Sequence, residues 1–206
     1  MTARQASKRS VPSLARPTEA VIESHLQTWG TLDKYQLHDA TLSLLFRELC
    51  PSHRELPQVL LKVSVLNDFY STNIYNTVAM AEHIVGLDIE DRIANGDASV
   101  VSEIASVVIA EKPRYCYSFA SKYCSHHQPE HFPIFDSYVE AMLKHFRGVD
   151  QFASFKNSDL RNYANFVNVV HAFRRHYSLD RFSLREIDVY LWLAGKAAFG
   201  KPRQSG

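Results

Sequence analysis

Apolar residues recur at helical spacing along almost the whole chain. This periodicity predicts helices over about residues 18–29, 33–49, 56–70, 74–86, 88–95, 98–110, 115–127, 136–146, 158–178 and 183–195. The segment 56–70 is apolar on nearly every side, which is typical of a helix at the centre of a domain. Only the β-branched residues between 100 and 109 offer a place for a strand, and no alternating run is long enough for a sheet. The pattern therefore predicts an all-α protein.

The predicted helices form one domain between two basic ends. Residues 1–16 are basic, Ser-rich and interrupted by a proline, so we expect a flexible arm there, and residues 200–206 are a second basic tail. Residues 17–199 then form a single helical domain. Its last helices carry aromatic residues at helical spacing, among them Tyr163, Phe166 and Phe173, which we expect in the core.

Charge is balanced over the whole chain but not along it. The sequence has 23 Lys+Arg against 22 Asp+Glu, for a net charge of +1. Residues 1–16 carry +4, residues 17–111 carry −9 and residues 112–206 carry +6. Such opposed blocks can give one face to a polyanion, so the near-zero total does not exclude a nucleic-acid partner.

Several classes of protein are disfavoured by what the sequence lacks. Its three cysteines form no C-x-x-C pair, which argues against a disulfide framework and an iron–sulfur site. Cys116, Cys124 and the histidines at 126, 127 and 131 lack the paired spacing of structural zinc sites. No window approaches a membrane span and no signal peptide is evident. We therefore expect no metal, no cofactor and no membrane contact, and a reducing cytoplasm, or the nucleus in a eukaryote.

The most informative stretch runs from Tyr115 to Phe146. Within it Ser118 and Lys122 are four residues apart and share a helix face. A proline-bracketed loop then leads to Asp136, whose apolar neighbours would leave its carboxylate partly desolvated. Such a carboxylate can stabilise a developing cation or take a proton from water. The alternative is an acid that stabilises the helix N-terminus by about 0.3–1 kcal/mol without any catalysis.

The run His131-Phe132-Pro133-Ile134-Phe135-Asp136, followed by Ser137-Tyr138-Val139, resembles the signature of the helix-hairpin-helix DNA glycosylases. In that superfamily a proline-containing loop leads to a catalytic Asp at a helix start. Residues 66–84 are similar to the family's opening helix pair, whose break inserts into the duplex, and 98–127 would be the two hairpin helices. The resemblance implies a two-lobed helical fold with residues 60–146 as its core and 17–59 and 147–199 as flanking helices.

The resemblance also implies roles for individual residues. Asp136 would be catalytic, and Lys122 is the candidate nucleophile if the protein also cleaves the DNA backbone. A gapless alignment places Ser118 where such lyase members carry their Schiff-base Lys, with Lys122 one turn later, so both a glycosylase without lyase activity and a bifunctional enzyme remain open. Residues 70, 73 and 75 lie at the break between two helices and are candidates for the wedge that fills the gap left by a flipped base. The full set of implied DNA contacts is Lys112, Arg114, Ser118, Ser121, Tyr70, Asn73, Tyr75 and His126. Tyr190 and Trp192 are expected in the core, with the base pocket as the alternative.

One departure from the family divides the hypotheses. The family hairpin normally reads Leu-Pro-Gly-x-Gly, whereas residues 111–118 contain no glycine, so Lys112 and Arg114 would replace backbone amides at the phosphates.

The first hypothesis is an enzyme, expected to be a monomer, that flips and excises a damaged or modified base from double-stranded DNA, in base excision repair or in defence against modified foreign DNA. The second is a non-catalytic helical module that binds DNA or a protein. The missing glycines favour the second hypothesis, and the FPIFD run favours the first.

Overall fold

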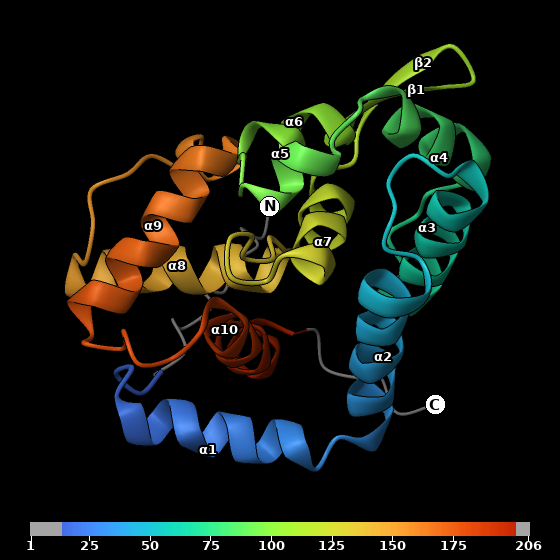
Figure 1. The fold of residues 1–206 in the computed structure, drawn as a ribbon. Helices are drawn as coiled ribbons and strands as arrows, with labels where there is room; N and C mark the ends of the chain where they lie inside the picture. The colour runs from blue at the N-terminus through green and yellow to red at the C-terminus, as the bar shows by residue number, and fades with distance from the viewer. Residues whose placement is uncertain (1–13, 201–206) are drawn as a thin grey trace, which may run out of the picture.

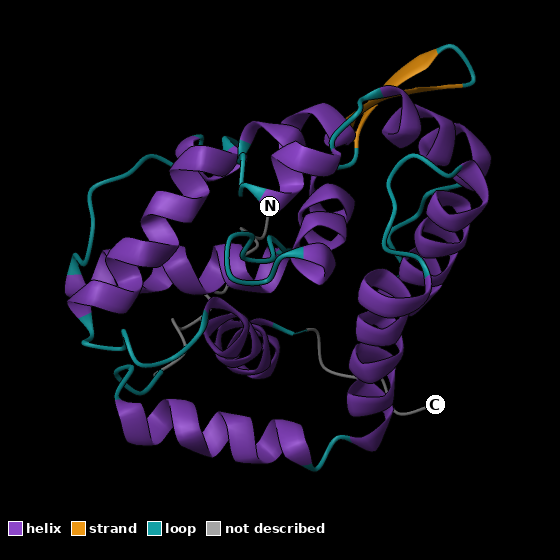
Figure 2. Ribbon diagram, in the orientation of Figure 1, coloured by secondary structure: helices purple, strands orange, loops and turns teal. Residues whose placement is uncertain are grey.

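A computed structural model describes residues 14–200 and shows a mostly helical protein with one small β-ribbon (Figures 1 and 2). The helices are α1 (Glu19–Gly30), α2 (Asp33–Leu44), α3 (Leu56–Tyr70), α4 (Thr77–Gly86), α5 (Glu90–Ala94), α6 (Ser99–Ala105), α7 (Tyr117–His127), α8 (Ser137–Asp150), α9 (Tyr163–His176) and α10 (Leu184–Phe199), and the strands are β1 (Ser106–Ile109) and β2 (Lys112–Tyr115). The predicted all-α class is thus confirmed for the described residues, apart from the small ribbon. Most of the predicted basic arm and tail lies outside the described residues.

Polar side chains at the helix starts explain why several predicted boundaries agree with the structure. Thr18 caps α1, where its hydroxyl accepts the Val21 N–H at 3.3 Å. Ser183 and Glu186 form a reciprocal capping box at the start of α10. Each cap satisfies backbone N–H groups that the first turn leaves without partners.

Helix α10 packs between α8 and α1 (Figure 1). Its Ile187 and Leu191 are fully buried. The expectation that 56–70 is the central helix is wrong, because α3 lies at one side of the molecule and leaves Leu61 47% exposed. The aromatic residues predicted in the core are buried: Tyr163, Phe166 and Phe173 are at most 1% exposed.

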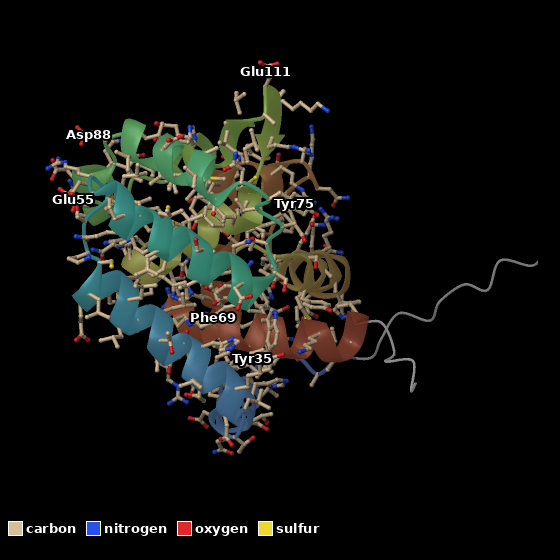
Figure 3. The ribbon with its side chains drawn as sticks, turned by 90° about the vertical axis from the view of Figure 1, so that its right-hand side faces the viewer. Tyr35, Glu55, Phe69, Tyr75, Asp88 and Glu111 are labelled. Atoms are coloured by element: carbon tan, nitrogen blue, oxygen red, sulfur yellow. The ribbon has the colours of Figure 1, made fainter. Side chains whose placement is uncertain are left out.

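The predicted helix over 98–110 is the largest error in the secondary structure. Helix α6 ends at Ala105, and residues 106–115 form an antiparallel ribbon in which Val107 pairs with Arg114. Consecutive β-branched residues explain the change, because they pack well in an extended strand and lower helix propensity. The ribbon projects from the body of the protein, with Glu111 at its tip (Figures 1 and 3).

Other predicted helices differ from the structure by a few residues at their ends, as α8 and α10 do, which extend to Asp150 and Phe199. The helix predicted to reach residue 49 becomes a π-helical turn at Leu45–Leu49, and the one predicted from 158 begins as a short 3-10 turn before α9. Within residues 14–200, no helix has the length and apolar character needed to cross a membrane.

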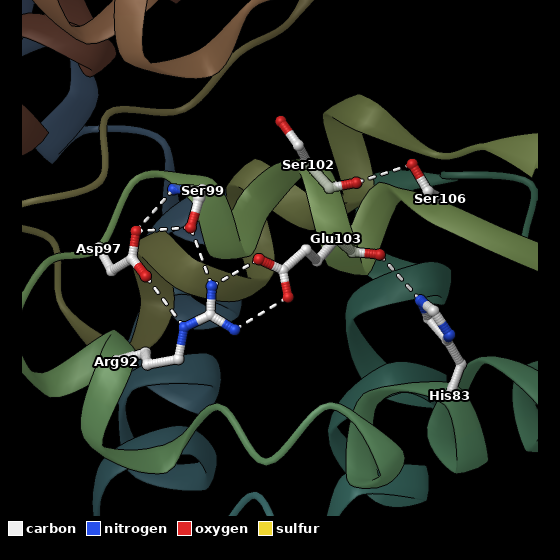
Figure 4. A network of polar contacts seen from close by, with 7 residues as sticks. All are labelled: His83, Arg92, Asp97, Ser99, Ser102, Glu103 and Ser106. Carbon is white, nitrogen blue, oxygen red and sulfur yellow. Dashed lines mark hydrogen bonds and ion pairs between the residues drawn. The ribbon is translucent and has the colours of Figure 1, made fainter.

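A polar network fixes the short helices α5 and α6 to each other (Figure 4). The Arg92 guanidinium donates to both carboxylate oxygens of Glu103, at 2.9 and 2.5 Å, and to Asp97 at 2.9 Å. His83 of α4 contacts the Glu103 carbonyl oxygen at 2.9 Å. Bidentate contacts of this kind fix orientation as well as adding stability, so the network holds the base of the ribbon in place.

Candidate functional site

A cavity of about 570 Å³ lies where six helices meet beside the FPIFD loop. It is enclosed by α10, the C-terminal ends of α1 and α3, the first half of α2, α7 and the N-terminus of α8. Its volume falls within the range of small-molecule sites. Both predicted catalytic residues, Lys122 and Asp136, line it, as do Ser118 and Tyr70.

Asp136 stands at the cavity wall as the N-cap of α8. Its Oδ1 accepts the backbone N–H of Tyr138 at 2.8 Å and of Val139 at 2.9 Å. The structure therefore gives Asp136 the capping role of the structural alternative and also places it in a cavity. Among the described residues its Oδ2 makes no hydrogen bond, so one carboxylate oxygen stays available to a ligand.

Three buried contacts hold the loop that carries Asp136. The Ser121 hydroxyl accepts the Phe135 N–H at 3.0 Å, and Asp188 Oδ2 accepts the Ile134 N–H at 2.8 Å. The Tyr163 hydroxyl donates to the Pro133 carbonyl at 2.8 Å. Because these partners come from α7, α10 and α9, the loop conformation depends on the whole domain rather than on the loop sequence.

Lys122 is a buried amine at the cavity wall, only 4% exposed. Its Nζ donates to Ser118 Oγ at 2.6 Å and lies 5.2 Å from the centre of the Tyr70 ring. Burial lowers the pKa of Lys122 to about 8, against the opposing influence of the Asp136 and Asp188 carboxyls. A useful fraction of the side chain is therefore a neutral amine near physiological pH, as nucleophilic attack requires.

Aromatic rings form another part of the cavity wall. Trp29 stacks on Tyr35, and Trp192 meets Tyr35 edge-on at 5.1 Å. His38 stacks on Phe69 with ring centres 3.9 Å apart. Tyr35 and Phe69 lie near each other in Figure 3. Trp192 thus follows the pocket alternative of the prediction, whereas Tyr190 is in the core at 1% exposure.

Helix α10 adds polar groups to this wall that the sequence reasoning missed. Arg185 pairs with Asp39 at 2.5 Å, and both line the cavity. Asp188 is 3% exposed, and burial raises the pKa of its carboxyl to about 8. The available signal was an acid between Ile187 and Leu191, on the face of the helix that the apolar pattern assigns to the core.

The structure gives two predicted DNA contacts roles inside the protein. Ser121 is fully buried and supports the loop, and His126 is 7% exposed and lies 3.0 Å from the Tyr70 hydroxyl. Burial lowers the pKa of His126 well below its usual value. Neither side chain reaches the surface where DNA would lie.

The remaining predicted DNA contacts divide into cavity and surface groups. Tyr70 lines the cavity instead of projecting from the break between α3 and α4, where Tyr75 is 89% exposed beside Asn73 (Figure 3). Lys112 and Arg114 are both exposed on β2.

The basic C-terminal block is only partly available to a polyanion. Arg181 pairs with Glu19 and Glu23, and Arg185 with Asp39, so these cations neutralise acids of the N-terminal block. The charge asymmetry along the sequence is therefore in part an internal complementarity of α1 and α2 with α10 and the loop before it.

Metal ligands do not cluster in the part of the chain that the structure describes: no three His, Cys, Asp or Glu side chains there come together as a candidate site. Cys124 and His126 of the candidate zinc set are buried in α7. The described residues that line the cavity supply carboxyl, amine and guanidinium groups together with aromatic surfaces.

Comparison with known proteins identifies a relationship. An uncharacterized protein of Haemophilus influenzae is 47% identical over 146 residues, which cover 70% of this chain and 70% of that protein. No solved structure gives a significant match. The model of the HI_0787_N family, an N-terminal domain, matches residues 21–131, more than half of the chain. The protein therefore belongs to the HI_0787_N family.

Proposed function

We propose that the protein is a DNA N-glycosylase that excises a damaged or modified base, with a structure related to the helix-hairpin-helix glycosylases. One observation carries the proposal: Lys122, the candidate nucleophile, and Asp136, the candidate catalytic carboxylate, line the same cavity of about 570 Å³. The aromatic part of the cavity wall offers stacking surfaces for a flipped base.

The geometry supports a two-group mechanism. Cleavage at C1′ passes through an oxocarbenium-like state, which the free oxygen of Asp136 would stabilise. The neutral amine of Lys122 would form a bond to C1′ as the bond to the base breaks, and its proton would pass to the departing base. The covalent product would be a Schiff base after opening of the sugar ring. Asp136 alone, with water as the attacking group, would give a glycosylase without lyase activity.

The surface around the ribbon supports a DNA partner. Lys112 and Arg114 lie two residues apart on β2, so they share a face of the ribbon and can contact phosphates by direct charge. Tyr75 projects from a break whose backbone is fixed by Asn67, which bonds both the N–H and the carbonyl of Ile74. A rigid, exposed aromatic at this place suits a wedge that fills the gap left by a flipped base.

The test is excision from duplexes that each carry one modified base, followed by alkali cleavage at abasic sites. We expect at least one base to be released by the natural protein and release to fall by about three orders of magnitude in Asp136→Asn. Asn can still cap α8, so this variant is matched for stability. Equal yields from the two proteins across the panel would exclude the enzyme and leave the helical binding module.

Borohydride reduction distinguishes the two mechanisms. If Lys122 forms a Schiff base, reduction traps a covalent protein–DNA adduct that is absent from Lys122→Ala. Excision without an adduct assigns the attack to water. An adduct that persists in Lys122→Ala assigns the nucleophile to another amine.

A further inference from the structure

Asp188 lines the cavity, and one oxygen of its buried carboxyl has no hydrogen-bond partner among the described residues. Its Oδ2 accepts the Ile134 N–H at 2.8 Å, but its Oδ1 has no hydrogen-bond partner among the described residues although it is shielded from solvent. A buried polar atom without a partner costs about 1–3 kcal/mol, and native proteins rarely retain one without a use. The loop contact through Ile134 explains one oxygen of this carboxyl and leaves the other for a ligand.

The surroundings of Asp188 favour its neutral form. Neither nearby cation is bonded to it, because Arg185 pairs with Asp39 at 2.5 Å and Lys122 donates to Ser118 at 2.6 Å. A buried carboxyl without a bonded cation takes a proton in preference to a charge. Burial accordingly raises the pKa of Asp188 to about 8. The titratable groups that face it from the surrounding elements are Tyr70, Lys122, Asp136, Tyr163 and Arg185.

Hydrogen-bond geometry then decides which oxygen carries the proton. Since Oδ2 accepts the Ile134 N–H, the proton of a neutral Asp188 belongs on Oδ1, which becomes a donor. We propose that Asp188 is a specificity-determining residue that donates its Oδ1–H to a carbonyl oxygen of the bound base. The inference rests on the proposed function, because it names the class of base that the cavity accepts: one with a ring carbonyl, held between this donor and the aromatic wall.

Free-base binding tests the proposal without requiring excision. The probe is 1-methylcytosine, which has a ring carbonyl, and indole is a ring of similar shape without an acceptor; neither titrates between about pH 6.5 and pH 9. Binding is followed by ligand-observed NMR on the full chain. We expect the affinity of the natural protein for 1-methylcytosine to fall about tenfold over this pH range, as Oδ1 loses its proton, and the affinity for indole to stay constant.

Asp188→Asn is the matched variant. Its side-chain oxygen can accept the Ile134 N–H, and its NH₂ group is a permanent donor in place of Oδ1–H. We expect this variant to bind 1-methylcytosine as the natural protein does at pH 6.5 and to lose the alkaline decline. Thermal unfolding checks that the loop contact is kept.

Two outcomes overturn the inference. One is an alkaline decline of the same size in Asp188→Asn, and the other is no preference of the natural protein for 1-methylcytosine over indole at pH 6.5. Either result leaves the proposed excision, tested with Asp136→Asn, unaffected. Conversely, the expected pH dependence without any excision would support Asp188 as a donor to a ring carbonyl and would exclude the glycosylase activity.

Discussion

The protein buries two lysines with similar electrostatics but different surroundings. Lys62 of α3 is fully buried and Lys122 of α7 is 4% exposed, and burial lowers the pKa of each to about 8. Lys62 Nζ is enclosed: it donates to the Ser52 carbonyl at 2.7 Å and lies 3.2 Å from His127 Nε2. Lys122 instead lines the cavity that also holds Asp136.

The comparison shows that a lowered pKa alone does not mark a functional lysine. Desolvation lowers the pKa of any buried amine, but chemistry also needs space for a substrate and a second reactive group. Lys62 has protein on all sides, including the rings of Phe46 and Tyr123 at 5.7 and 5.5 Å. The structure gives Lys62 a structural role, whereas the cavity beside Lys122 is consistent with the chemical role proposed for it.

The largest expected effect separates the two lysines by activity. If Lys122 is the proposed nucleophile, Lys122→Ala should remove the trapped adduct completely and lower lyase turnover by about three orders of magnitude, because it is the one amine among the described residues that lines the cavity. Lys62→Ala should leave the turnover of its folded fraction within about threefold of the natural protein. Single-turnover assays corrected for the folded fraction measure both. Loss of turnover in folded Lys62→Ala would show that the enclosed cluster also serves the reaction.

For stability, we expect the larger effect from Lys62→Ala and the smaller one from Lys122→Ala. Lys62→Ala removes two hydrogen bonds and leaves a closed void, which should lower the free energy of unfolding by about 3 kcal/mol. Lys122→Ala opens space onto an existing cavity and removes a desolvated charge, so its cost should be about 1 kcal/mol. Urea unfolding compares the two variants. Equal losses of unfolding free energy in the two variants would mean that the cavity wall around Lys122 is packed as tightly as the enclosed site around Lys62.

Sequence reasoning reached one of these lysines and missed the other for a physical reason. Lys122 lies one turn after Ser118 and 14 residues before Asp136, so spacing over a short stretch of sequence was enough to identify it. The helix caps at Thr18 and Ser183 are local in the same sense. Lys62 lies in an apolar helix, where a lysine most often reaches solvent; its burial depends on partners in the 50–55 loop and α7.

The same distinction explains the error at the ribbon and the missed wall of the cavity. Residues 106–109 fit either a helix or a strand until they pair with 112–115, and this pairing is a tertiary contact. The wall formed by Tyr35, Phe69 and Asp188 joins α2 and α3 to α10, which lies far from them in the chain. Spacing in one sequence gives the faces of single helices but does not say which faces meet.

Acid should destabilise the cluster around Lys62 through its histidines. Burial, and then the Lys62 charge, lowers the pKa of His53 from 6.5 to about 3, and that of His127 is lowered well below 6.5. Above about pH 6.5 both rings are neutral in the folded and the unfolded chain, so this contribution to stability is fully present. As the pH falls toward 3, the unfolded chain takes up protons that the folded chain excludes. We expect the His53 ring to cost about 2 kcal/mol by pH 5, and protonation of His127 to add to this loss.

Urea unfolding at pH 7 and pH 5 measures this loss. The control is His53→Gln, which removes one titrating ring and should reduce the difference between the two pH values by about 2 kcal/mol. A pH dependence unchanged by this substitution would assign the acid sensitivity to another group.

The smallest expected effect compares the tyrosines beside the two lysines. Tyr123 is fully buried and its hydroxyl lies 3.1 Å from His53 Nδ1, whereas the Tyr70 hydroxyl lies 3.0 Å from His126 Nε2 at the cavity. Tyr123→Phe should lower the free energy of unfolding by about 1 kcal/mol, because a buried ring nitrogen loses its partner and water cannot replace it. Tyr70→Phe should cost about half as much, since Tyr70 lines the cavity and water can enter the space left by its hydroxyl. Because Phe keeps the ring that faces the Lys122 amine, Tyr70→Phe should also keep the trapped adduct. Loss of the adduct in that variant would show that the Tyr70 hydroxyl takes part in the chemistry together with Lys122.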